Sequence, residues 1–64
     1  MKWRNVAFIH KEDAEECRKE LRENKILTGE IYTFKGSRFF YLPWQPRTRK
    51  QMMEGYSIID KYID

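Results

Sequence analysis

Few side chains in this sequence could carry covalent chemistry or proton transfer. His10 and Cys17 are its only imidazole and its only thiol, and a Cys–His pair forms a nucleophile when the imidazole activates the thiol. Cys17, however, shares a predicted helical stripe with Ala14 and Leu21, where a free cysteine packs as a small apolar side chain. We therefore expect Cys17 to lie in the core and His10 to be a polar residue at a strand-to-helix junction.

The remaining candidates for catalysis or metal binding lack the partners that such sites need. The four carboxylates within residues 12–16 do not have the spacing of a twelve-residue calcium loop and are expected to form a solvated helix start. Nothing adjacent in the sequence would tune Tyr32, Tyr56 or Tyr62 as a general acid. The chain has no Gly-rich phosphate loop and no nucleophile elbow. The sequence thus predicts no enzyme, no cofactor and no metal site.

Basic side chains, by contrast, are concentrated in one part of the chain. The sequence has 13 Lys and Arg against 10 Asp and Glu, a formal net charge of +3. Residues 31–53 contain five basic residues and no acidic one, whereas the rest of the chain carries eight basic and ten acidic residues. The five are Lys35, Arg38, Arg47, Arg49 and Lys50. The positive excess therefore falls in this segment, which predicts an anionic partner.

Aromatic residues are interleaved with these cations, namely Phe34, Phe39, Phe40, Tyr41 and Trp44. Cations neutralise phosphates and flat rings stack on bases at about 1–3 kcal/mol each, a combination typical of single-stranded nucleic-acid binding. Arg47, Arg49 and Lys50 also fall in the first turns of a predicted helix, where the macrodipole favours anions and disfavours cations. Both an anion site and a merely solvated helix start are compatible with that placement.

Residues 35–42, Lys-Gly-Ser-Arg-Phe-Phe-Tyr-Leu, distantly resemble the RNP1 signature of the RNA recognition motif. Lys35, Gly36 and Phe39 match that signature. Three positions depart from it, with other residues where a stacking ring, a small residue and a second aromatic belong: Ser37, Arg38 and Leu42. The resemblance covers eight of the 64 residues. It implies an analogous position on a central strand and not membership of the family, whose fold needs a fourth strand.

Five predicted elements position these side chains: a strand at Lys2–Ile9, a helix at Glu12–Glu23, strands at Ile26–Phe34 and Arg38–Trp44, and a helix at Pro46–Ile63. A short link at Lys35–Ser37 predicts a hairpin turn with Gly36 at positive φ. Gly29, inside the second strand, predicts a bulge or a close approach by another backbone. Asn24 is expected to end the first helix.

The second helix is expected to begin with Pro46 at its first position, where the missing N–H costs nothing. Its predicted apolar stripe consists of Met52, Tyr56, Ile59 and Ile63, with Met53 and Tyr62 flanking it. Gly55 lies inside this helix at a cost of up to about 1 kcal/mol relative to Ala. That cost predicts a close contact with a neighbouring element at Gly55.

The β-α-β-β-α order predicts an α+β fold with a three-stranded antiparallel or mixed sheet in the order 1-3-2. Both helices are expected on one face, as in a ferredoxin-like fold truncated by its fourth strand. The missing strand would leave the edge of Lys2–Ile9 unpaired, and an unpaired edge favours pairing with a second copy. A homodimer through that edge is therefore one predicted assembly.

Strand alternation divides the third strand between the two faces of the sheet. Phe40, Leu42 and Trp44 form the more apolar set and are expected to meet the helices. Phe39 and Tyr41 would then lie on the open face, joined by Tyr32 and Phe34 from the second strand. An exposed patch of this kind usually marks an interface.

The length of 64 residues predicts a single small domain spanning 1–64, with a thin core. One cysteine allows no internal disulfide, which is typical of intracellular proteins, and no apolar run approaches the roughly 20 residues of a membrane span. We therefore expect a cytoplasmic protein without a membrane partner.

These observations predict a small protein that binds RNA or single-stranded DNA. The expected phosphate contacts are Lys35, Arg38, Arg47, Arg49 and Lys50, and the rings expected to stack or pack are Phe39, Tyr41 and Trp44. The alternative is a protein-interaction or inhibitor module, or a homo-oligomeric accessory protein of viral or mobile-element type, with no nucleic-acid ligand. Aromatic and Arg residues are also typical anchors of protein interfaces, so composition alone leaves both open.

Overall fold

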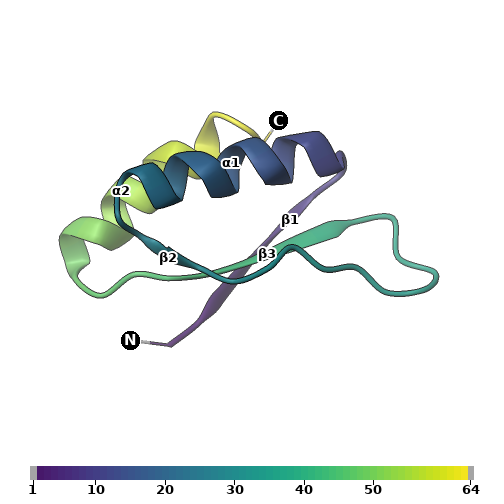
Figure 1. Cartoon of the computed structure of the whole chain (residues 1–64), viewed down its shortest axis with the longest axis horizontal. Helices are drawn as coiled ribbons and strands as arrows, with labels where there is room; N and C mark the ends of the chain where they lie inside the picture. Colours follow the sequence, from purple (N-terminus) through teal and green to yellow (C-terminus); the bar gives the residue numbers. More distant parts are fainter. Residues whose placement is uncertain (1, 64) are drawn as a thin grey trace.

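A computed structural model of the chain describes residues 2–63 and has an α+β architecture (Figure 1). Its elements, in chain order, are β1 (Arg4–Phe8), α1 (Lys11–Glu23), β2 (Leu27–Thr28), β3 (Phe40–Gln45) and α2 (Arg49–Asp60). The predicted order of strands and helices is confirmed. Within the described residues, neither helix is long and apolar enough to cross a membrane.

The sheet has the predicted strand order, β1-β3-β2, with β3 in the centre. Both outer strands run antiparallel to β3, with Val6 opposite Leu42 and Thr28 opposite Trp44. Figure 1 shows α1 and α2 on the same side of this sheet. Within residues 2–63 no helix covers the other face of the sheet, which agrees with the prediction of both helices on one face.

The second strand is much shorter than predicted, because regular pairing ends at Thr28 and does not continue to residue 34. Pairing resumes only at an isolated bridge between Tyr32 and Tyr41. The three residues 29–31 therefore lie opposite only two residues of β3, Leu42 and Pro43, and one extra residue on one strand is the geometry of a bulge. Gly29 donates its N–H to the carbonyl of Pro43 at 2.8 Å, but Pro43 has no N–H to return.

The bulge also explains the glycine at position 29. A Cβ there would come within 2.8 Å of Cγ of Pro43, so the predicted close approach is real, although it is made by a proline ring and not by backbone. The hairpin turn is confirmed as well. Gly36 has a φ of 88°, and Ser37 N–H donates to the carbonyl of Phe34 at 3.0 Å.

α1 ends in a Schellman motif. Ile26 N–H donates to the carbonyl of Leu21, and Lys25 N–H donates to that of Arg22. Asn24 is the C-cap, as predicted, and Lys25 adopts the left-handed conformation at φ 63°. At the other end of the helix, His10 is the N-cap residue at the strand-to-helix junction. The turn buries Ile26 directly after the helix.

The predicted start of α2 is wrong by three residues. Pro46 precedes the helix, and Thr48 is the N-cap, with its side-chain oxygen accepting the N–H of Gln51 at 3.1 Å. The Gln51 side chain in turn accepts the N–H of Arg47 at 2.9 Å. This exchange of hydrogen bonds is a variant of the capping box. The helix therefore begins after the Thr48-x-x-Gln51 cap and not at Pro46.

The core is a single cluster of buried side chains between the sheet and the helices: Phe8, Ala14, Cys17, Leu21, Ile26, Leu42, Trp44, Ile58 and Ile59. The predicted α1 stripe and the inward position of Leu42 and Trp44 are confirmed. The α2 stripe is partly wrong, since Tyr56 and Ile63 are exposed and Gly55 and Ile58 are buried.

Trp44 accounts for this rotation of the α2 face. A Cβ at position 55 would lie 2.3 Å from Cζ3 of Trp44, so only glycine lets the helix approach the indole. Tyr56 then packs edge-on against the same indole, with ring centroids 5.2 Å apart. The close contact predicted at Gly55 is confirmed, and it sets which residues of α2 face the sheet.

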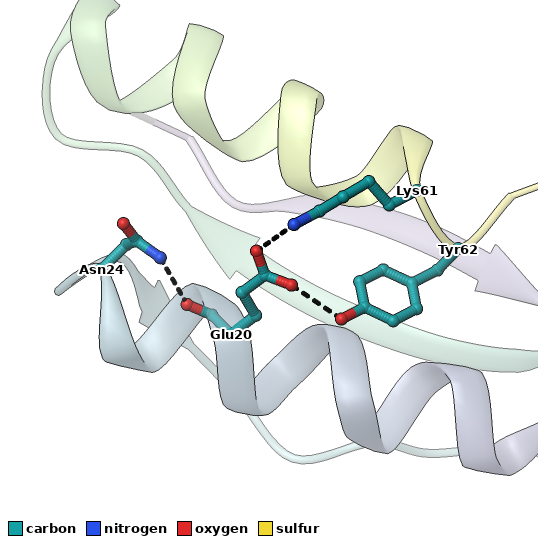
Figure 2. A network of polar contacts seen from close by, with 4 residues as sticks. All are labelled: Glu20, Asn24, Lys61 and Tyr62. Carbon is teal, nitrogen blue, oxygen red and sulfur yellow. Dashed lines mark hydrogen bonds and ion pairs between the residues drawn. The ribbon is translucent and has the colours of Figure 1, made fainter.

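A polar cluster joins α1 to the end of α2 (Figure 2). The carboxylate of Glu20 forms an ion pair with Lys61 and accepts the hydroxyl proton of Tyr62 at 2.7 Å. The bond from Lys61 has the larger effect and that from Tyr62 the smaller, and together they hold the pKa of Glu20 below its ordinary value. The same hydrogen bond raises the pKa of Tyr62 to about 12. The cluster thus holds Lys61 and Tyr62, the residues that follow α2, against α1.

Candidate functional site

The most prominent exposed feature is a set of three rings on the open face of the sheet, the hairpin ring cluster, formed by Tyr32, Phe34 and Tyr41. The Tyr41 ring stacks on Tyr32 at a centroid distance of 5.3 Å and on Phe34 at 5.5 Å. The hydroxyl of Tyr41 also lies 3.3 Å from Oγ of Ser37. Tyr41 is therefore the fixed centre of the cluster.

The outer rings of this cluster remain available to a ligand. Tyr32 is 45% exposed and Phe34 is 59% exposed. Both belong to the irregular segment between β2 and the hairpin turn, and the bulge at residues 29–31 aligns Tyr32 with Tyr41. Strand alternation predicted both rings on the open face, but they were not among the predicted binding residues.

The open face continues from the hairpin ring cluster across the sheet. Tyr32 donates its hydroxyl to Oδ1 of Asn5 on β1 at 3.4 Å. Trp3, half exposed, lies next to Gly29 and Pro43 at the far side of the same face. Aromatic and proline rings thus line the uncovered side of the sheet from the hairpin to the start of β1.

Two of the rings predicted for the site lie elsewhere. Trp44 is 1% exposed and packs against Gly55. The sequence left open whether Trp44 stacks on a ligand or packs in the core, and the structure shows that it packs in the core. Phe39 precedes β3, so strand alternation does not govern it. It lines a separate pocket of about 230 Å³ with residues of the β1–α1 junction and the chain end, among them His10 and Ile63.

The five predicted cations do not form one surface. Lys35 and Arg38 lie on the hairpin, whereas Arg47, Arg49 and Lys50 lie at the start of α2. Figure 1 shows these segments at opposite ends of the molecule's longest dimension, which is 35 Å. Strand β3 separates them, because each extended residue adds about 3.3 Å. All five are exposed.

The start of α2 is less open to an anion than the sequence suggested. Arg49 and Lys50 are helical, but Arg47 lies before the N-cap. The amides of Arg47 and Gln51 are occupied by the cap, since they donate to the Gln51 and Thr48 side chains. An anion at this end would therefore have to be held mainly by side chains.

Three further cations, which were not among the predicted binding residues, meet Arg47 at this end. Arg18, Arg22 and Lys25 line one pocket together with Arg47, and no acidic residue among residues 2–63 lines it. We name it the basic pocket. The spacing of Arg18 and Arg22 by four residues, which puts both on one helix face, was the available signal. It was hidden because their segment of the chain is acidic overall.

Cys17 and the carboxylates match their predicted roles. Cys17 is fully buried, and burial raises the pKa of its thiol to about 12, so it stays protonated and unreactive near neutral pH. Glu12 and Asp13 lie in the first turn of α1. Among the described residues, no group of His, Cys, Asp and Glu side chains is arranged to hold a metal ion.

A scan of the chain against protein-family models gives no match, and searches of curated proteins and of solved structures give none either. Function must therefore be inferred from the geometry of this chain.

Proposed function

We propose that this protein binds single-stranded nucleic acid, RNA or single-stranded DNA, on the open face of its sheet. The observation that carries the proposal is the hairpin ring cluster, in which Tyr32 and Phe34 remain exposed while stacked on Tyr41. Rings held in this way offer flat surfaces to unpaired bases without the entropy cost of ordering them first.

The exposed cations of the hairpin support the proposal, because they lie beside the ring cluster. Lys35 and Arg38 lie on the hairpin between Phe34 and Tyr41, and both are exposed. Arg49 and Lys50 lie at the opposite end of the molecule, at the start of a helix on the other side of the sheet. A strand that crosses the open face would therefore have to pass the end of the sheet to reach them. Duplex DNA fits less well, because its bases are stacked on each other and its major groove is read by an inserted helix or ribbon.

The test is to remove one exposed ring at a time and measure binding of a mixed-sequence single-stranded oligonucleotide at low salt. Each of Tyr32→Ala and Phe34→Ala is expected to weaken binding by roughly 1–3 kcal/mol, which is at least about fivefold. Met53→Ala is the matched control, because Met53 is an apolar residue on α2 that is even more exposed than the two rings and lies away from the face. Unchanged affinity in both ring variants would contradict the proposal.

The cations are tested separately by charge reversal of Lys35 and Arg38. Both the affinity and the salt dependence should fall, because each lost phosphate contact removes about 0.7 from the slope of log K against log salt. A ligand held only by apolar contacts would leave that slope unchanged.

A second candidate function, a protein-interaction module or homodimer, is supported by a different observation. Within residues 2–63, β1 pairs only with β3, so the outer edge of the Lys2–Ile9 segment offers unpaired backbone groups to another strand. A dimer through this edge would make the melting temperature rise with protein concentration. A larger protein partner would instead bind with little salt dependence.

We also infer how the fold relates to a known architecture and in which cellular compartment the protein occurs. We interpret the β-α-β-β-α arrangement as a ferredoxin-like fold that lacks its fourth strand, the one that would cover the open edge of β1. The protonated, buried Cys17 suits a cytoplasmic protein, where thiols stay reduced.

A further inference from the structure

The basic pocket lies at the end of the molecule opposite the hairpin, where the end of α1, β2 and the approach to α2 meet. It has a volume of about 510 Å³, and four of its lining side chains are cations: Arg18, Arg22, Lys25 and Arg47. They come from both sides of the pocket, two from α1, one from the turn after it and one from the segment before α2. Four like charges around one hollow repel one another, and a bound anion would relieve that repulsion.

Hydrogen bonds to the backbone hold the walls of this pocket in place. Arg18 donates its Nε–H to the carbonyl of Gly29 at 3.0 Å, which fixes the plane of its guanidinium. Gln51 donates from Nε2 to the carbonyl of Lys25 at 3.3 Å and accepts the N–H of Arg47. Gln51 therefore ties the segment before α2 to the turn after α1. The Arg18 guanidinium and the backbone that carries Lys25 and Arg47 are therefore held before a ligand binds, which reduces the entropy cost of binding.

One polar group in the wall lacks a partner. Thr28 lines the pocket, and its hydroxyl oxygen is buried without a hydrogen bond to any described residue. Buried hydroxyls are nearly always hydrogen-bonded. Because this oxygen is closed to solvent, the cations and not the Thr28 hydroxyl would contact a bound anion.

We infer that the basic pocket binds a phosphate monoester dianion. Guanidinium groups pair with phosphate oxygens through two parallel hydrogen bonds, and the pocket presents three guanidinium groups and one ammonium. A phosphate monoester carries a charge of about −1.5 to −2 at pH 7. A diester inside a nucleic-acid strand carries only one, so this charge density selects a terminal or free phosphate. The inference does not depend on the proposed binding of single strands.

The first experiment is an amide NMR titration with inorganic phosphate at pH 7, compared with chloride at equal ionic strength. We expect saturable shifts in residues 22–28 and 47–51 with phosphate and not with chloride. Arg22→Gln and Arg47→Gln should each weaken binding about tenfold, the loss expected for one hydrogen-bonded charge pair. The matched control is Lys11→Gln, which removes one positive charge from the other end of α1 and does not line the pocket.

Two results would overturn the inference. Shifts that increase linearly without saturation would show screening and not a site. Equal weakening in Lys11→Gln and Arg22→Gln would show an effect of net charge alone. Because Arg22 and Arg47 are exposed, their variants should fold, and the same spectra report directly whether they do.

A second arm distinguishes the source of the phosphate. A 5′-phosphorylated oligonucleotide and the same sequence with a 5′-hydroxyl are titrated in parallel. Tighter binding of the phosphorylated strand, with shifts at the basic pocket, would identify the end of a nucleic acid as the ligand. Equal binding of the two strands, with inorganic phosphate still saturating the pocket, would identify a small phosphate ester. Failure of both strands to shift the open face would contradict only the proposed function.

Discussion

Gly55 occupies a position where a helix usually gains stability from alanine, yet here the gain should reverse. Gly55→Ala in a helix interior ordinarily stabilises by up to about 1 kcal/mol, but the added Cβ would lie 2.3 Å from Trp44. Overpacking of this kind costs typically 1–3 kcal/mol. We expect a net loss of stability of about 1–2 kcal/mol in urea unfolding. Ser57→Ala, at an exposed position of the same helix, is the control and should be neutral or slightly stabilising.

The contacts of Glu20 make the stability of the fold depend on pH in the acid range. Its pKa is lowered in the folded state by Lys61 and Tyr62. The stabilisation is therefore present above the ordinary pKa of a glutamate and is lost as the pH falls through the folded value. Glu20→Gln should lower the melting temperature at pH 7 and flatten its decline between neutral and acid pH.

The control for this prediction is Glu23→Gln, which removes the same charge from the same helix. Its melting temperature should follow the acid decline of the parent protein. If the parent and Glu20→Gln lose melting temperature equally on acidification, the Glu20 contacts do not stabilise the fold.

At the scale of elements, the start of α2 depends on its cap and not on its proline. Thr48→Ala should destabilise the protein by about 1 kcal/mol, because it removes the oxygen that accepts the Gln51 N–H. Chemical denaturation measures the change. The sign is decisive: if Pro46 were the first helical residue, Thr48 would be interior and alanine would stabilise instead. Gln51→Ala should also destabilise, since Gln51 completes the cap and bonds Lys25.

Sequence patterns predicted the elements where one local signal dominates. The α1 stripe and its acidic first turn agree with the helix observed, and Gly36 fixes the hairpin. The errors arise where a distant residue decides the geometry. Pro43 interrupts the ladder opposite Gly29, which shortens β2, and Trp44 rotates the buried face of α2 towards Ile58. Neither effect is visible in the local sequence of the element that it changes.

At the scale of the whole molecule, the candidate site illustrates the same limit. Residues 31–53 contain five basic residues and no acidic one, which predicted one surface, but β3 carries the chain from one end of the molecule to the other (Figure 1). Arg18 and Arg22, from a segment that is acidic overall, instead meet Arg47 through the packing of α1 against the start of α2. A count of charges along the sequence therefore reveals neither the separation of the cations of residues 31–53 nor the basic pocket.

Because the cations lie at two ends of the molecule, we expect the salt dependence of binding to change with the length of the bound strand. If a single strand crosses the open face, an oligonucleotide of about four nucleotides should reach the hairpin cations alone, and one of about twelve should reach both ends. Two phosphate contacts give a slope of log K against log salt of about −1.4, and four give about −2.8.

Fluorescence anisotropy over a series of lengths and salt concentrations measures this slope. The steep slope of the longer strand should be lost in Arg49→Gln/Lys50→Gln, while the shorter strand should bind that variant unchanged. An equal slope at every length would place all phosphate contacts at one end of the molecule. A strand would then be held at the hairpin only, and the cations at the start of α2 would serve a different ligand.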